Sequence, residues 1–271
     1  MSRQVYYRAL QSRKRKQKTS EKTVALVQDI RCLMPKIGTR KLYHLLESDL
    51  KNLHVGRDKL FRILKANNLL IKPKRRYHIT TDSHHRFRKH KNLIRSININ
   101  RPEQVWVSDI TYIGTRENPS YLAHVTDAYS KRIMGYDVSD NLSLIGALNA
   151  LKMAIKGRNF IDKLLVHHSD KGLQYCSNDY QELLQKSFLK CSMTEKYDPY
   201  ENAIAERING ILKQEFEIDK HNVDLALRTS IVRDAIKIYN NLRPHLSNHM
   251  LTPSCMHRQN QLQPVRYKKE R

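Results

Sequence analysis

The sequence predicts an α/β protein in which a mixed five-stranded sheet is flanked by helices and preceded by a small all-α domain. From about residue 100 onward, strand-like and helix-like apolar patterns follow one another in the order βββαβαβα, which is typical of a sheet with helices on its faces. Before residue 72, the apolar residues recur at helical spacing. The length of 271 residues agrees with about two domains.

The first 19 residues are polar and basic, with RKRKQK at positions 13–18. We expect them to form a solvated tail, an arm that contacts phosphates, or both. A first helix is expected to begin at Ser20, which can cap it, and to end at Pro35. Its apolar residues recur at helical spacing, at Val24, Val27, Ile30 and Met34.

Two more helices are expected in this region. Thr39 can cap the segment TRKLYHLLESDL, and the segment GRDKLFRILKANN follows it. Three short helices with basic outer faces suggest a helix-turn-helix unit that contacts DNA, although similar packing also occurs as an inert scaffold. The candidate DNA contacts on these faces are Arg40, Lys41, Arg57 and Lys59.

The rest of the chain divides by composition and pattern. Strands are expected at 104–113, 120–128, 132–139, 164–170 and about 190–194, and helices at 142–156, 178–187 and 201–216. The expected organisation is a basic arm at 1–19, a helix-turn-helix domain at 20–71, a basic linker at 72–99, a catalytic core at 100–218 and a helical and basic segment at 219–271.

The charge balance favours a polyanionic partner. Fifty Lys and Arg against 26 Asp and Glu give a net charge of +24 and a pI near 10.0. Solubility or binding of ribosomal-type RNA would also explain such a composition. No apolar stretch approaches the ~18–20 residues of a membrane span, and the N-terminus lacks the apolar segment of a signal peptide. We therefore expect a cytoplasmic protein with no membrane partner.

Three acidic residues stand in contexts that predict a catalytic metal site. Asp109 interrupts the strand-like run QVWVSDITYI, Asp170 ends KLLVHHSD, and Glu206 lies in the helical pattern ENAIAERINGILKQEF. Hard cations such as Mg²⁺ take clustered oxygen ligands, and a pair of them can clamp an in-line phosphoryl displacement. An aspartate inside an apolar strand is intrinsically disfavoured, which points to function. The alternatives are a salt-bridged or edge position for Asp109 and a helix cap for Asp170.

The helix around Glu206 has a polar arc of unusual composition. At 100° per residue this arc contains Asn202, Glu206, Asn209 and Lys213. The arrangement fits Glu206 facing a metal and Lys213 facing a nearby phosphate. Ordinary amphipathicity would produce a polar face as well, and a solvent-exposed lysine is the alternative for Lys213.

Three motifs, WVSDITYI, HHSDKGLQYCS and ENAIAERINGILKQE, resemble the catalytic core of retroviral-integrase-like DDE transposases. The closest resemblance is to the second-frame product of bacterial insertion-sequence family three, and the 35 residues between Asp170 and Glu206 match its spacing. PKIGTRKLYHLL resembles the family's helix-turn-helix segment and YNNLRPHLSNHMLTP its C-terminal signature, so most of residues 25–255 is covered. One departure is Glu201-Asn202-Ala203, where many relatives have Asp-Asn-Ala.

The resemblance implies an RNase H-like fold and a DNA transposase that performs metal-dependent cleavage and strand transfer at insertion-sequence ends. It implies that Asp109, Asp170 and Glu206 hold two Mg²⁺ ions, for which Mn²⁺ can substitute, and that Lys213 is the basic residue two turns beyond the glutamate. Asp127 matches no motif of the family and is interpreted as structural. Further candidates are Lys171 for DNA contact and His168, Gln174 and Asn202 for substrate positioning; for His168 and Gln174 the alternative is a role in supporting the metal ligands or in packing.

The implied partners are terminal inverted repeats and target DNA, bound by a homo-oligomer in the bacterial nucleoid. An upstream-frame product, fused to this chain or associated with it, is also implied. Two rival functions stay open at this stage. One is a non-catalytic, sequence-specific DNA-binding protein or repressor that retains the fold, and the other is an RNase H-like nuclease without strand transfer.

Overall fold

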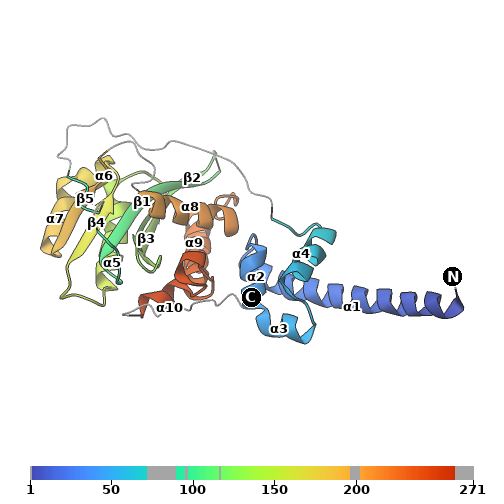
Figure 1. Ribbon diagram of the computed structural model, residues 1–271. Helices are drawn as coiled ribbons and strands as arrows, with labels where there is room; N and C mark the ends of the chain where they lie inside the picture. Colours follow the sequence, from blue (N-terminus) through green and yellow to red (C-terminus); the bar gives the residue numbers. More distant parts are fainter. Residues whose placement is uncertain (1, 72–89, 95–96, 116, 196–201, 260–271) are drawn as a thin grey trace. The chain divides into compact units, whose positions relative to one another are not determined.

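A computed structural model of the chain describes residues 2–71, 90–94, 97–115, 117–195 and 202–259, and these form two compact units, 1–75 and 76–271 (Figure 1). Most of the expected linker at 72–99, Glu201 and residues 260–271 lie outside the described ranges. No helix within these ranges is long and apolar enough to cross a membrane.

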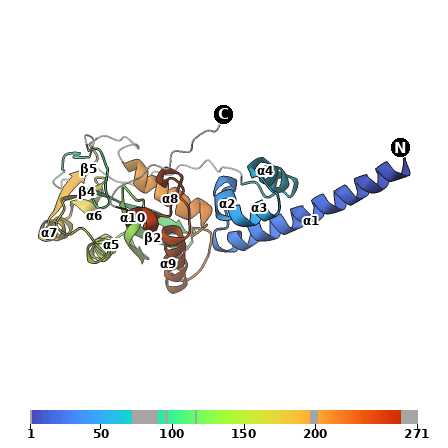
Figure 2. The same ribbon diagram turned by 60° about the horizontal axis from the view of Figure 1, so that its bottom comes forward.

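The N-terminal unit is helical. Its elements are α1 (Arg3–Leu33), α2 (Thr39–Leu45), α3 (Glu47–Asn52) and α4 (Arg57–Ala66). The second half of α1 packs against the short helices, and its first half extends beyond them (Figures 1 and 2). The interior is mostly apolar and includes the fully buried Val27, Ile37, Leu42, Leu50, Leu60 and Leu64. The small all-α domain expected from the sequence is therefore confirmed.

The first helix begins earlier than expected. Ser2 caps it by accepting a hydrogen bond from the backbone N–H of Val5, at 3.4 Å, so the expected start at Ser20 is wrong. Residues 3–19 contain no Gly or Pro and many good helix formers, so nothing in them interrupts the helix. Their side chains are almost all exposed and mostly polar or basic, and this composition is also that of a solvated tail.

The second unit is built on a mixed sheet, as predicted. Within the described ranges its strands are β1 (Val105–Gly114), β2 (Pro119–Asp127), β3 (Ile133–Ser139), β4 (Leu165–Ser169) and β5 (Leu189–Met193). Their order across the sheet is β3-β2-β1-β4-β5. The first three strands are antiparallel neighbours, whereas β4 runs parallel to both β1 and β5.

Helices cover both faces of this sheet (Figure 1). One face packs on α5 (Leu144–Lys156), α6 (Leu173–Cys176) and α7 (Asn178–Lys186), around a core that includes Trp106 and Leu151. The other face carries Val105 and Val107, which cluster with Ala205 of α8 (Ala203–Glu215). Because side chains alternate along a strand, Asp109 shares the α8 face with these two valines.

The C-terminal helices close the edge at β3. Asn240 on α9 (Leu225–Asn241) accepts from the backbone N–H of Ile133 and donates to its carbonyl, both at 3.0 Å, so its amide continues the ladder of the edge strand. A 3₁₀ turn (Leu246–Asn248) and α10 (Pro253–His257) follow.

A buried ionic network ties α10 to the sheet. His257 Nε2 lies 3.2 Å from Glu103 Oε1, and its Nδ1 lies 3.0 Å from Ser130 Oγ. Asp127 accepts hydrogen bonds from the backbone N–H of Glu103 at 2.7 Å and from Ser130 Oγ at 2.6 Å. These contacts give Asp127 a structural role, in agreement with its interpretation from the sequence.

Candidate active site

Strand register brings the first two acidic residues together. β1 and β4 run parallel, with Val105 opposite Val166 and Val107 opposite His168. The same register, continued by two residues, places Asp109 beside Asp170, which follows β4 directly. Gly172 donates its backbone N–H to Asp170 Oδ1 at 3.0 Å, which holds the turn after the strand. Two carboxylates therefore lie at one level of the sheet.

The environment of Asp109 is poorly suited to an uncompensated charge. Loss of hydration, together with the nearby carboxylates of Asp170 and Glu206, raises the pKa of Asp109 to about 8. A backbone hydrogen bond from Ile110 and the charge of Lys213 act in the opposite direction. The site thus gathers more negative charge than the surrounding protein groups balance.

Helix α8 turns its polar arc toward Asp109. Asn209 Nδ2 donates to Asp109 Oδ2 at 2.6 Å, and both Glu206 and Lys213 act on the Asp109 charge. Glu206 is exposed, and partial loss of hydration raises its pKa. Lys213 is half-buried, and burial lowers its pKa despite the nearby carboxylates of Asp219 and Asp109. Glu206 and Lys213 therefore stand on either side of Asn209, above the strand that carries Asp109.

The other candidate residues contact protein groups. His168 is buried with Nδ1 at 2.9 Å from Ser192 Oγ. Gln174 Nε2 donates to the carbonyl of Leu142 at 3.1 Å, and Lys171 Nζ donates to the carbonyl of Glu195 at 2.7 Å.

Asn202 is also buried, and its Nδ2 donates to the carbonyl of Ser108 at 3.3 Å. The contacts of His168 and Gln174 are compatible with the packing roles that the sequence left open for these two residues. The Oδ1 atom of Asn202 has no hydrogen-bond partner within the described residues.

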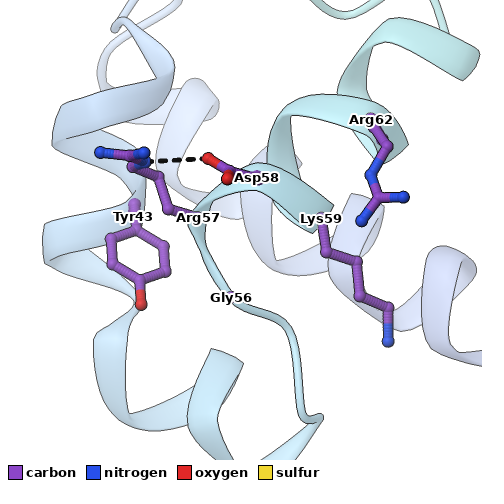
Figure 3. Close-up of a pocket in the computed structure, with 6 residues that line it drawn as sticks. All are labelled: Tyr43, Gly56, Arg57, Asp58, Lys59 and Arg62. Atoms are coloured by element: carbon purple, nitrogen blue, oxygen red, sulfur yellow. Dashed lines mark hydrogen bonds and ion pairs between the residues drawn. The ribbon is translucent and has the colours of Figure 1, made fainter.

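The N-terminal unit has a basic pocket at the start of α4 (Figure 3). It encloses about 550 Å³ and is lined by Tyr43, Gly56, Arg57, Asp58, Lys59 and Arg62. Arg57 extends toward Tyr43 and pairs with Asp58 at 3.0 Å, while Lys59 and Arg62 extend along another side of the helix.

Lys41 does not lie on this outer surface. Helix α2 turns Thr39, Lys41 and Leu42 inward, and Lys41 is only 7% exposed, so its expected place on an exposed face is wrong. Arg40, its neighbour, is exposed.

Comparison with known proteins identifies the family. Residues 99–199 and 188–253 match two family models, each described as an integrase core domain. The insertion element IS600 uncharacterized 31 kDa protein of Shigella sonnei is 34% identical over 261 residues, which cover 94% of each chain. Transposase InsF for insertion sequence IS3fB of Escherichia coli K12 is 36% identical over 160 residues, 59% of this chain and 55% of its own. The chain belongs to the IS3 family of transposases.

A solved structure agrees with the fold of this transposase. A chain of the simian T-cell lymphotropic virus intasome, in complex with PP2A regulatory subunit B56 gamma, aligns with a TM-score of 0.51 at 18% identity. The alignment covers 86% of the transposase and 79% of that chain. At this identity the likeness concerns the fold alone, and it confirms the integrase-type core that the sequence motifs implied.

The acidic residues of the transposase have the type of ligand atom that a hard metal ion prefers. Carboxylate oxygens are the ligands that Mg²⁺ and Mn²⁺ prefer, and the excess negative charge that raises the pKa of Asp109 is what a bound cation would relieve. Within the described ranges, however, no three Asp, Glu, His or Cys side chains are already gathered in a metal-binding cluster.

Two hydrogen bonds at the site were not foreseen from the sequence, that of Asn209 with Asp109 and that of His124 with Asn209. Asn209 was placed on the polar arc of its helix without a role, and His124, which contacts Asn209, was not singled out. The available signal was a histidine inside the otherwise apolar strand YLAHV. Its meaning depends on the pairing of β1 with β2, which single-strand patterns do not specify.

Proposed function

We propose that this member of the IS3 family cuts and joins DNA at the ends of its insertion sequence by metal-dependent phosphoryl transfer. Family membership establishes DNA transposition as the general activity. The observation that supports the chemistry is the placement of Asp109, in the middle of β1, beside Asp170 at the end of β4, with α8 carrying Glu206 nearby.

The metal-binding residues would be Asp109, Asp170 and Glu206. Two Mg²⁺ ions, or Mn²⁺ in their place, would supply charge stabilisation for the attacking and leaving oxygens of the phosphate. The three side chains come from the middle of β1, the end of β4 and a helix, so movement of α8 relative to the sheet would complete the ligand set. Such tightening when substrate binds is common for catalytic groups in free enzymes.

Basic residues of the same region would hold the DNA. Lys213 lies on the α8 arc near Asp109, and Lys171 follows Asp170 directly. Both would contact the phosphates that flank the scissile bond. One site can then serve cleavage, in which water attacks, and strand transfer, in which a 3′-OH attacks, because only the attacking oxygen differs.

The N-terminal unit would bind DNA through the start of α4. Arg57, Lys59 and Arg62 surround the pocket described above, and Arg40 adds a further exposed positive charge. A helix that presents its first turn and two arginines to solvent is suited to phosphate and base-edge contact in a groove. We assign terminal inverted repeats and target DNA as the ligands of the whole chain. Assembly as a homo-oligomer on DNA, and association with the upstream-frame product, complete the proposal.

A labelled duplex that carries the insertion-sequence end tests the proposal. With Mg²⁺ present we expect cleavage products and, when target DNA is added, joined products. Binding without cleavage would favour a DNA-binding protein or repressor, and cleavage without joining would favour a nuclease.

A further inference from the structure

A buried chain of hydrogen bonds runs from β2 through α8 to Asp109. His124 lies directly opposite Asp109 in the pairing of β1 with β2, and its Nε2 lies 2.9 Å from Asn209 Oδ1. Its Nδ1 lies 3.1 Å from Thr126 Oγ1. Asn209 Nδ2 in turn reaches Asp109 Oδ2 at 2.6 Å. Thr126, His124 and Asn209 are all at most 8% exposed, so water does not substitute for these partners.

The chain of hydrogen bonds can have only one donor-to-acceptor direction when Asp109 is ionised. A carboxylate only accepts hydrogen bonds, so Asn209 must present its NH₂ group to Asp109 and its carbonyl to His124. His124 Nε2 must then carry the hydrogen and donate it. Burial lowers the pKa of His124 to about 4, so the ring is neutral and its Nδ1 is an acceptor, which leaves the Thr126 hydroxyl as donor.

The opposite tautomer would break two contacts at once. With the hydrogen on Nδ1, the lone pair of His124 Nε2 would face the carbonyl oxygen of Asn209. Two acceptors would then meet in a buried site, at a cost of about 1–3 kcal/mol for each polar group left unsatisfied. The contact between β2 and α8 therefore selects the His124 tautomer that carries its hydrogen on Nε2. This tautomer is called the ring form of His124 below.

We propose that His124 and Thr126 are positioning residues that fix the orientation of Asp109 through Asn209. The Asp109 carboxylate can rotate about its Cβ–Cγ bond, and Asn209 holds one of its oxygens. The histidine keeps the Asn209 amide from turning over, and the threonine keeps the histidine in its donor form. A carboxylate held in this way loses less freedom when it binds a cation. The link to metal binding rests on the proposed function, whereas the ring form of His124 does not.

The ring form can be measured directly by NMR in the full chain with ¹⁵N-labelled histidine. The His124 signals are assigned by their loss in His124→Gln. The spectra are recorded at pH 9, well above the usual pKa values of carboxyl and imidazole groups. We expect the Nε2–H form to dominate, and Thr126→Val to increase the Nδ1–H form. A wild-type ring in the Nδ1–H form, or averaged equally between the two, would overturn the proposal.

Mn²⁺ affinity and turnover test the consequence. We expect His124→Leu to release the Asn209 amide that holds Asp109, and so to weaken Mn²⁺ binding and lower kcat by up to the ~10–100-fold that follows loss of a direct partner of a metal ligand, with little change in KM for DNA. His124→Gln keeps an N–H donor toward Asn209 and should recover part of the loss. Thr126→Val should show a smaller effect in the same direction.

Thr23→Val is the matched control, since it removes an equally buried threonine hydroxyl in the N-terminal unit, where Thr23 bonds to the carbonyl of Thr19. Unchanged Mn²⁺ affinity and kcat in folded His124→Leu and Thr126→Val would overturn the positioning role. If the wild-type chain neither bound Mn²⁺ nor cleaved DNA, the proposed function would fail, and the ring form alone would decide whether the hydrogen-bond chain exists.

Discussion

Asp109 and Asp170 stand at the same level of two parallel neighbouring strands. The register that pairs Val107 with His168 reaches both aspartates two residues later, just as β4 ends. Residues far apart in sequence thus meet by strand pairing.

Lys213 provides a test of the DNA contact near the site. Lys213→Ala should reduce cleavage and strand transfer by about tenfold, the loss expected when a charge-assisted hydrogen bond of about 1.5 kcal/mol is removed, with little change in thermal stability. Lys220→Ala is the control, because Lys220 lies beyond α8 and pairs with Glu217. Near-normal activity in both variants would remove Lys213 from the DNA-contacting residues.

The pocket at the start of α4 predicts a salt-dependent DNA contact. Arg57→Ala combined with Arg62→Ala in the full chain should weaken DNA binding and make the slope of log K against log salt shallower by about 0.9 for each lost phosphate contact. Lys51→Ala, an exposed lysine paired with Glu47, serves as the control. If the double variant kept both the affinity and the slope, the N-terminal unit would not bind DNA through this pocket.

The network around His257 predicts a pH-dependent stability. Burial lowers the pKa of His257, but its bonds to Asp127 and Glu103 outweigh this and raise it above 6.5, against a smaller opposing effect of Arg132. A raised pKa stabilises the fold below pH 6.5, and this contribution is lost as the pH rises through the folded value. Burial raises the pKa of Glu103, yet His257 and the backbone of Asn159 and Phe160 bring it below 4.5.

The contribution of Glu103 is therefore present above pH 4.5 and is lost as the pH falls through its lowered value. Both contributions coincide between pH 4.5 and 6.5. His257→Gln should lower the free energy of unfolding there by about 1–3 kcal/mol and flatten its decline toward pH 8, in urea melts at several pH values. His221→Gln, in an exposed loop, should keep the wild-type profile. If the pH dependence of stability in His257→Gln were the same as in the wild type, the ionic pairing of His257 with Glu103 and Asp127 would be contradicted.

Substitution by alanine should change the stability of the protein in opposite directions at two glycines. A Cβ on Gly135 of β3 would lie 2.0 Å from the carbonyl oxygen of Ala150 on α5, so Gly135→Ala should destabilise the core by about 1–3 kcal/mol. A Cβ on Gly210, inside α8, meets nothing within 4 Å. Gly210→Ala should therefore stabilise the helix by about 0.5–1 kcal/mol. Thermal unfolding decides, and equal effects would contradict the close packing of α5 on β3.

The strands of the sheet could be predicted well from the sequence, because each one either alternates apolar and polar residues or consists of a long apolar run. Each of the five lies within two residues of its expected position. The prediction failed at the start of α1. Residues 3–19 form an exposed helix, but their polar and basic composition is also that of a solvated tail. The prediction also failed for Lys41, because the pattern of the short helix α2 does not reveal which residues turn inward.

The site was predictable only in part. Family motifs and a 35-residue gap drew attention to Asp109, Asp170 and Glu206, and helical geometry placed Asn209 and Lys213 on one arc. The contact between His124 and Asn209 could not be foreseen, because it depends on the register of β2 against β1 and on the docking of α8. Such contacts are properties of the assembled sheet.

The central claim is that three carboxylates hold the metal ions for DNA cleavage. The most direct measurement is Mg²⁺-dependent cleavage of a labelled insertion-sequence end by Asp109→Asn, Asp170→Asn and Glu206→Gln, with DNA binding measured in parallel. Glu182→Gln is the control, since this exposed acid on α7 pairs with Lys186. We predict that each of the three variants loses cleavage to background while binding DNA like the wild type, and that the control cleaves normally. Near wild-type cleavage by any of the three would contradict the account.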